Sequence, residues 1–72
     1  MGRVRNRLKY WRHRHQMNQT EFAQLLGLQQ QQYNRYERQT IQPTLVTALI
    51  IAAKIKQPVE EIFYIEEYAL GD

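Results

Sequence analysis

Residues 19–38 contain two short runs in which apolar positions recur at helical spacing. The first stripe is Phe22, Leu25 and Leu26, and the second is Leu28, Tyr33 and Tyr36. Gly27 separates them, and glycine readily adopts the left-handed backbone with which a helix ends and the chain turns. The pattern predicts two helices joined by a tight turn, with a polar face left open on the second helix.

The rest of the chain also favours helices and contains no convincing strand. One helical stripe, made of Val4, Leu8, Trp11 and His15, places a first helix near residues 3–15. Pro58 begins a short last helix whose inward positions are Val59, Ile62 and Phe63. We therefore expect an all-α fold, a compact five-helix domain over residues 1–72 with a helix-turn-helix at about 19–38.

Capping signals mark where three of these helices begin. Asn18 with Glu21 three residues later is typical of a capping box at the start of the second helix, and the third begins at Gln29. Thr44 is the expected N-cap of a strongly apolar helix over 45–55. The core stripe predicted for that helix is Leu45, Ala48, Leu49, Ala52 and Ile55.

Composition limits the classes of protein to which this chain can belong. A domain of 72 residues buries a small core and has a small net stability. The absence of cysteine excludes a disulfide framework and a thiolate zinc site. No apolar run approaches the roughly 20 residues of a membrane helix, and the basic N-terminus lacks the apolar segment of a secretory signal. We expect a soluble cytoplasmic protein.

Charge is distributed unevenly around the net value of +3. Residues 1–16 contain six basic residues and no acidic one, whereas residues 57–72 contain five acidic residues and no basic one. A molecule of this kind would turn its basic end toward phosphate and keep its acidic end away. The alternative is a solubilising charge pattern that has no ligand.

Several short motifs follow one another in the order typical of one family. They are Leu8-x-x-Trp11-Arg12, Met17-Asn18-Gln19-x-Glu21-Phe22-Ala23-x-x-Leu26-Gly27, Tyr36-Glu37, Pro43-x-Leu45, Ile51-Ala52 and Val59-Glu60-Glu61-Ile62-Phe63. Over roughly residues 4–65, the chain resembles the lambdoid phage repressor family of Cro/CI type. The resemblance implies five helices, operator binding as a dimer, and a third helix that lies in the major groove.

The resemblance also implies an ion pair between Arg12 and Glu37 that clamps the third helix against the scaffold. Two positions depart from the family, which often has glycine where this chain has Gln39 and Lys56. Each non-glycine residue costs about 1 kcal/mol if its backbone must be left-handed. These departures concern the geometry of two loops and leave the expected fold unchanged.

The polar face of the third helix carries side chains that suit DNA. Amides match adenine N6 and N7, and a guanidinium fork matches guanine O6 and N7. The predicted base contacts are Gln30, Gln31, Asn34 and Arg35, with a merely solvated helix face as the alternative. The predicted phosphate contacts are Asn18, Gln19, Gln29 and Arg38. Weaker candidates, reaching the backbone or a groove as a loose arm, are Arg3, Arg5 and Arg7.

The helix over 45–55 has a second apolar stripe, Val46, Ile50 and Ala53, beyond the one that its own core needs. Such a stripe on a small protein indicates a partner surface, and we expect a homodimer through it. A C-terminal segment would extend this surface, through Tyr64, Ile65, Tyr68, Ala69 and Leu70. The alternative is that the stripe packs under the tail of its own chain.

No catalytic, metal or cofactor site is expected. His13 and His15 are two residues apart and do not share a helix face, and no nucleophile-and-base pair or phosphate-binding loop occurs. We interpret the chain as a regulator of transcription that binds double-stranded DNA sequence-specifically, a homodimeric repressor of a palindromic operator without membrane or small-molecule partners. The alternatives are the antitoxin half of a toxin–antitoxin pair, and non-specific nucleic-acid binding by the basic N-terminus.

Overall fold

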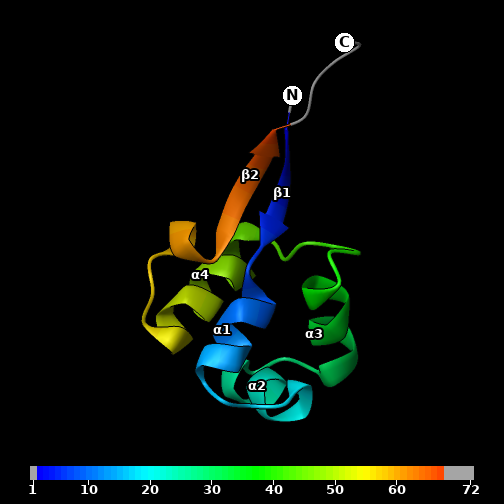
Figure 1. Cartoon of the computed structure of the whole chain (residues 1–72), viewed down its shortest axis with the longest axis vertical. Coiled ribbons are helices and arrows are strands. Elements are labelled where there is room, and N and C mark those ends of the chain that lie inside the picture. The colour runs from blue at the N-terminus through cyan, green and yellow to red at the C-terminus, as the bar shows by residue number, and fades with distance from the viewer. Residues whose placement is uncertain (1, 68–72) are drawn as a thin grey trace.

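A helical body and a two-stranded ribbon make up residues 2–67, which the computed structural model describes (Figure 1). In chain order the elements are β1 (Gly2–Asn6), α1 (Leu8–Arg14), α2 (Gln19–Leu26), α3 (Gln30–Glu37), α4 (Leu45–Ile55), the 3-10 helix η1 (Val59–Glu61) and β2 (Phe63–Glu67). The ribbon of β1 and β2 projects away from the helices. No helix in this part of the chain is long and apolar enough to cross a membrane.

Strands form at both ends of the described residues, so the helical domain is not purely all-α, and the helix predicted near residues 3–15 covers only Leu8–Arg14. β1 pairs with β2 in antiparallel register, with Val4 opposite Ile65 and Asn6 opposite Phe63. The aromatic and β-branched side chains of β2 suit a strand and give β1 its partner. Helix α1 begins only at Leu8, whose N–H donates to Asn6 Oδ1 at 3.1 Å.

The last predicted helix begins after Pro58 as expected but is only the three-residue 3-10 turn η1, so the described residues form four α-helices and this turn, and not clearly five helices. Pairing with β1 starts at Phe63 and draws the chain into an extended conformation. Val59, Ile62 and Phe63 still contact the core as predicted. Part of the expected C-terminal extension, Tyr68, Ala69 and Leu70, lies outside the described residues.

The core brings together the apolar stripes of all four α-helices. Its buried residues are Leu8, Phe22, Ala23, Leu26, Tyr33, Tyr36, Ile51, Ala52, Ile55 and Ile62. Phe22 meets Tyr33 edge to face at 5.7 Å between ring centroids, an arrangement that aromatic pairs favour. The inward placement of the two stripes in residues 19–38 is therefore confirmed.

Helix α4 buries three of its five predicted core residues, Ala48, Ala52 and Ile55, and adds Ile51, which was not predicted. Leu45 and Leu49 are 71% and 51% exposed, so their predicted place in the core is wrong. Because α4 is apolar on nearly every side, more than one stripe has helical period, and spacing alone does not select among them.

The oppositely charged ends of the chain lie side by side in the ribbon (Figure 1). Arg3 Nη2 on β1 lies 2.9 Å from Glu66 Oε1 on β2. Within the described residues, the acidic segment therefore lies beside the basic one, and the two do not form separate ends of the molecule. Cross-strand attraction between opposite charges favours this pairing.

Candidate DNA interface

The start and the end of α2 are both fixed by local interactions. Glu21 N–H donates to Asn18 Oδ1 at 2.8 Å, and the Glu21 carboxylate accepts from the Asn18 N–H at 2.9 Å. This capping box satisfies donors that the first helical turn would otherwise leave free. Gly27 ends α2 with φ of +75°, and the chain turns there toward α3. The predicted capping box and left-handed turn are confirmed.

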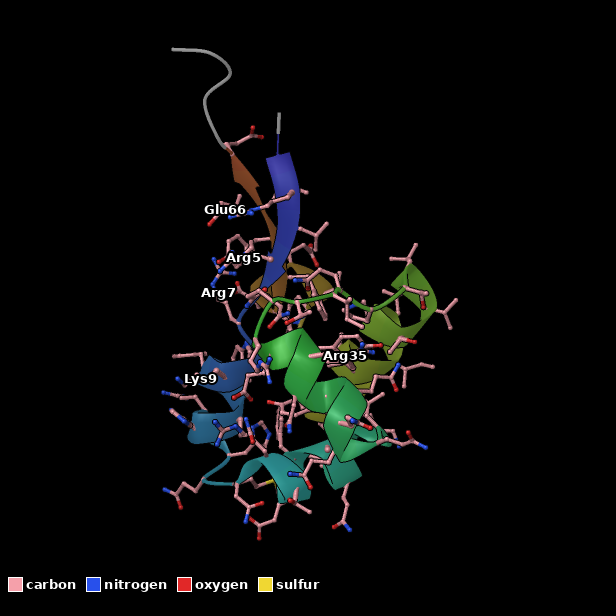
Figure 2. All side chains as sticks on the ribbon, turned by 90° about the vertical axis from the view of Figure 1, so that its right-hand side faces the viewer. Arg5, Arg7, Lys9, Arg35 and Glu66 are labelled. Atoms are coloured by element: carbon pink, nitrogen blue, oxygen red, sulfur yellow. The ribbon has the colours of Figure 1, made fainter. Side chains whose placement is uncertain are left out.

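Helix α3 has one buried face and one exposed face. Tyr33 and Tyr36 are buried, whereas Gln30, Gln31 and Arg35 are exposed. Figure 2 looks onto α3 and shows Arg35 extending from it. Beside this face lies an open hollow of about 400 Å³, lined by Gln29, Gln31, Gln32, Arg35 and Ile41. Amide and guanidinium groups thus line a concave surface between α3 and the loop that follows it.

The four predicted base-contact residues differ in how far they are exposed and bonded. Gln30 Oε1 accepts from Thr20 Oγ1 at 2.7 Å, which leaves the Gln30 amide nitrogen to donate. Within residues 2–67, the side chains of Gln31 and Arg35 make no hydrogen bond and stand open to solvent. Asn34 is only half-exposed, and its Oδ1 is buried without a hydrogen-bond partner. Gln30, Gln31 and Arg35 therefore project from α3 into solvent, whereas Asn34 lies between the exposed face and the buried face of the helix.

The predicted phosphate-contact residues lie at the start of α2 and at the two ends of α3. Asn18 is exposed and uses its Oδ1 for the cap, and Gln29 is an exposed N-cap whose side chain makes no capping bond. Arg38 is exposed and directly follows α3. Gln19 differs, because its Nε2 donates to Glu37 Oε1 at 3.2 Å. The start of α2 therefore contacts the end of α3.

Glu37 accepts several hydrogen bonds beneath α3. Arg12 donates from Nε to Oε2 at 2.9 Å and from Nη2 to Oε1 at 3.0 Å. The Tyr33 hydroxyl donates to Oε2, beside the bond from Gln19 to Oε1. The side chains of Arg12 and Glu37 are only 13% and 5% exposed. This two-pronged pair joins α1 to the last turn of α3, and the bond from Gln19 joins the start of α2 to the same turn.

The helix-turn-helix family matches residues 8–62, most of the chain and all four α-helices of the described part. The chain belongs to the Cro/CI-type helix-turn-helix family. This helix-turn-helix protein is accordingly a DNA-binding regulator of transcription. The match begins with α1 and ends before β2, so both strands of the ribbon lie outside it. No curated protein matches the chain.

The helix-turn-helix domain is tied to its ribbon by amide side chains that sequence analysis missed. Asn6 Nδ2 donates to Tyr36 O and to Gln42 Oε1, both at 2.9 Å. Gln39 Nε2 donates to Asn6 O at 2.9 Å, and Gln39 Oε1 accepts from the Asn6 N–H at 3.1 Å. These contacts fix the base of β1 against the end of α3. The only signal for these contacts in the sequence is Gln39, which stands where the family often has glycine.

Both departures from the family have left-handed backbones in this helix-turn-helix domain. Gln39 has φ of +65° and Lys56 has φ of +57°. The hydrogen bonds between Gln39 and Asn6 offset the strain at position 39, since each net hydrogen bond contributes about 1 kcal/mol. Lys56 ends α4 and is exposed, and within residues 2–67 its side chain makes no comparable contact.

The histidines of this helix-turn-helix domain show no arrangement for binding metal. His15 Nδ1 lies 2.8 Å from Trp11 O on the preceding helical turn. In the described part of the chain, no three acidic or histidine side chains gather where they could hold an ion.

Glu37 is ionised within its cluster. Burial alone would raise the pKa of Glu37, but hydrogen bonds from Arg12, Tyr33 and Gln19 outweigh burial and hold that pKa below its ordinary value of 4.5. The hydrogen bond to Glu37 raises the pKa of Arg12. Burial and then the bond to Glu37 raise the pKa of Tyr33. At neutral pH the cluster therefore holds one carboxylate, one guanidinium and one neutral phenol.

The lowered pKa of Glu37 predicts acid sensitivity of the fold. A carboxylate with a lowered folded pKa stabilises the native state above its ordinary pKa, and this contribution is lost as the pH falls through the folded pKa. Urea unfolding of the wild type and of Glu37→Gln should therefore differ most at neutral pH, and the difference should shrink below about pH 4.5. Glu60→Gln, at an exposed position, serves as control. A difference that stays constant into strong acid would contradict the lowered pKa.

Proposed function

We propose that this regulator is a sequence-specific repressor that binds a palindromic operator as a homodimer, with α3 in the major groove. The observation that carries the proposal is the outward face of α3, where Gln30, Gln31 and Arg35 are exposed. Amides pair with adenine and a guanidinium with guanine, so these side chains would read base edges. Asn34 would contribute from the flank of the same face.

The proposed phosphate contacts surround this face. Backbone N–H groups at the start of α2, beside Asn18 and Gln19, would donate to one phosphate, aided by the helix dipole. Gln29 and Arg38, at either end of α3, would bind others. Such contacts set the position of α3 on the duplex, while the base contacts supply sequence preference.

The cluster beneath α3 supports precise reading of bases. Glu37 receives hydrogen bonds from α1, from the start of α2 and from within α3. Recognition requires side chains that are held within a fraction of an ångström of the productive geometry. Because the end of α3 is fixed by a nearly buried ion pair, its outward side chains are presented from a rigid helix.

The homodimer rests on the exposed apolar face of α4. This face comprises Leu45, Val46, Leu49, Ile50 and Ala53. It includes all three residues of the stripe expected at the dimer interface, Val46, Ile50 and Ala53. Exposed apolar surface of this kind on a small protein favours a partner. A two-fold dimer would set two α3 helices about 34 Å apart, at successive major grooves of one side of the duplex. Occupation of a promoter by such a dimer would block transcription.

Arg35 and Arg38 should have separable roles on a site selected from random duplex DNA. Selection should enrich a palindrome whose half-sites are centred about 10 base pairs apart. On that site, Arg35→Ala should weaken binding by about 1–3 kcal/mol and relax preference at one base position. Arg38→Ala should weaken binding to every sequence alike. It should also make the slope of log affinity against log salt less steep by about 0.9, the value for one phosphate contact.

Fluorescence anisotropy on the selected site and on single-base variants, at several salt concentrations, measures both effects. Equal losses for the two variants on every sequence would contradict the division between base and phosphate contacts. Failure of the selection to enrich any sequence would contradict sequence-specific binding as a whole.

A further inference from the structure

The two faces of the ribbon differ in chemistry. Side chains alternate along β1, so Arg3 and Arg5 share one face, across from Glu66 and Tyr64 of β2. Arg7 and Lys9 continue this line of cations from the end of β1 into α1. Figure 2 shows Arg5, Arg7 and Lys9 one below another along one side of the molecule. We call Arg3, Arg5, Arg7 and Lys9 the basic row.

The basic row carries more positive charge than its neighbours neutralise. Glu66 Oε1 lies 2.9 Å from Arg3 Nη2 and 4.0 Å from Arg5 Nη1, so one carboxylate serves two guanidinium groups. Arg5 Nε is buried without a hydrogen-bond partner. The Arg7 guanidinium lies over the Tyr64 ring, 4.1 Å from its centroid. In the described chain, neither Arg7 nor Lys9 pairs with a carboxylate, and both are exposed.

The basic row has a fixed position relative to α3. Asn6, at the base of β1, is 5% exposed and bonds to Tyr36 O, Gln39 and Gln42 at the end of α3 and in the following loop. The first strand is therefore anchored to the helix that faces DNA, and residues 3–7 do not form the loose arm that the sequence suggested. Viewed onto α3, Lys9 lies to the left of that helix, and Arg7 and Arg5 follow above its upper end, beside the ribbon (Figure 2).

The ribbon also extends the reach of the protein beyond the helix-turn-helix. Five extended residues span about 17 Å, which corresponds to about five base pairs of duplex at 3.4 Å for each. Both strands lie outside the part of the chain that matches the family, so this reach is additional to the shared domain. A row of cations at such spacing suits a polymer of regularly spaced phosphates.

We propose that the basic row is a second DNA contact, which binds backbone phosphates of the duplex that flanks the bases facing α3. This inference rests on the proposed function, because it places the flanking duplex beside an α3 that is bound in the major groove. Phosphate contacts add affinity and fix orientation without adding sequence preference. Glu66 holds Arg3 and Arg5 in the free protein, and phosphates would compete with it for these guanidinium groups.

Salt dependence on two lengths of duplex tests the proposal. One duplex ends at the outermost bases of the selected site, and the other continues for about one helical turn, 10 base pairs, on each side. On the longer duplex, Arg7→Gln and Lys9→Gln should each make the negative slope of log affinity against log salt less steep by about 0.9. On the shorter duplex, both variants should bind as the wild type does, which also shows that they are folded. Arg7→Lys should retain the wild-type slope.

Matched substitutions separate the basic row from the overall charge. Lys54→Gln removes the same charge from the exposed end of α4 and should leave the slope unchanged on both duplexes. Glu66→Gln should tighten binding to the longer duplex several-fold, whereas Glu60→Gln, which makes the same change on η1, should do so far less.

Three outcomes would overturn the proposal. They are unchanged slopes for Arg7→Gln and Lys9→Gln on the longer duplex, equal reductions on both duplexes, or equal effects of Glu66→Gln and Glu60→Gln. Wild-type protein that still prefers the selected sequence would then show that only the flanking contact is wrong. Loss of that preference in the wild type would instead contradict the proposed function.

Discussion

Replacing Glu37 with alanine should unfold much of the protein at room temperature. The substitution removes the acceptor of four hydrogen bonds and leaves Arg12, which is 13% exposed, without its carboxylate. Removing one partner of a largely buried ion pair costs about 3–5 kcal/mol, because the other charge stays desolvated. Domains are stable by only about 5–15 kcal/mol, and small ones lie near the lower limit.

Urea titration followed by far-ultraviolet circular dichroism measures this loss. Glu60→Ala provides the control, because it removes a carboxylate from an exposed position and should leave the midpoint almost unchanged. DNA binding by Glu37→Ala should fall in step with the folded fraction, since the cluster supports α3 and does not itself face outward. A midpoint for Glu37→Ala that matches the Glu60→Ala control would show that the cluster contributes little to stability.

Ile50→Glu, on the exposed face of α4, should separate the proposed dimer and weaken its binding to DNA. Ile50 is 48% exposed in the single chain, so a glutamate is tolerated by the monomer, and its helices should be retained. Within a dimer interface, the same carboxylate would be buried against apolar side chains and would separate the subunits. A palindromic site then loses its second, linked contact, and affinity should fall by about 10²–10⁴-fold.

Sedimentation equilibrium and anisotropy on the palindrome test this expectation together. Gln24→Glu adds the same charge to an exposed position of α2 and should remain dimeric. A wild type that stays monomeric at high micromolar concentration would contradict the homodimer and assign the α4 face to another protein or to the tail of its own chain. If Ile50→Glu remains dimeric and binds normally, the subunits meet elsewhere.

The helix-turn-helix was predictable because its signals are local. The capping box of Asn18 and Glu21, the left-handed Gly27 and the stripe that ends in Tyr33 and Tyr36 all act within a few residues. Helical periodicity sets which side chains of α3 face the core, and therefore also which ones are left to face outward. The exposure of Gln30, Gln31 and Arg35 follows from the burial of the two tyrosines.

The ribbon was not predictable in this way, because each strand depends on a partner about sixty residues away. Val4 and Leu8 have the spacing of a helical stripe, but residues 2–6 form a strand because they pair with β2, where Ile65 lies opposite Val4. Once the strand forms, oppositely charged ends that look separate in the sequence come together, and Asn6 reaches the loop after α3.

The sequence by itself determined two helices, the turn between them and the polar face of α3, because caps and helical periods act over one or two turns. Only the tertiary structure decided where the buried face of α4 ends, because several faces satisfy the same period and packing buries Ile51 while it leaves Leu45 and Leu49 exposed. It also decided that Gln39, strained in its backbone, bonds to Asn6. These outcomes depend on contacts between segments distant in the chain, which no local pattern contains.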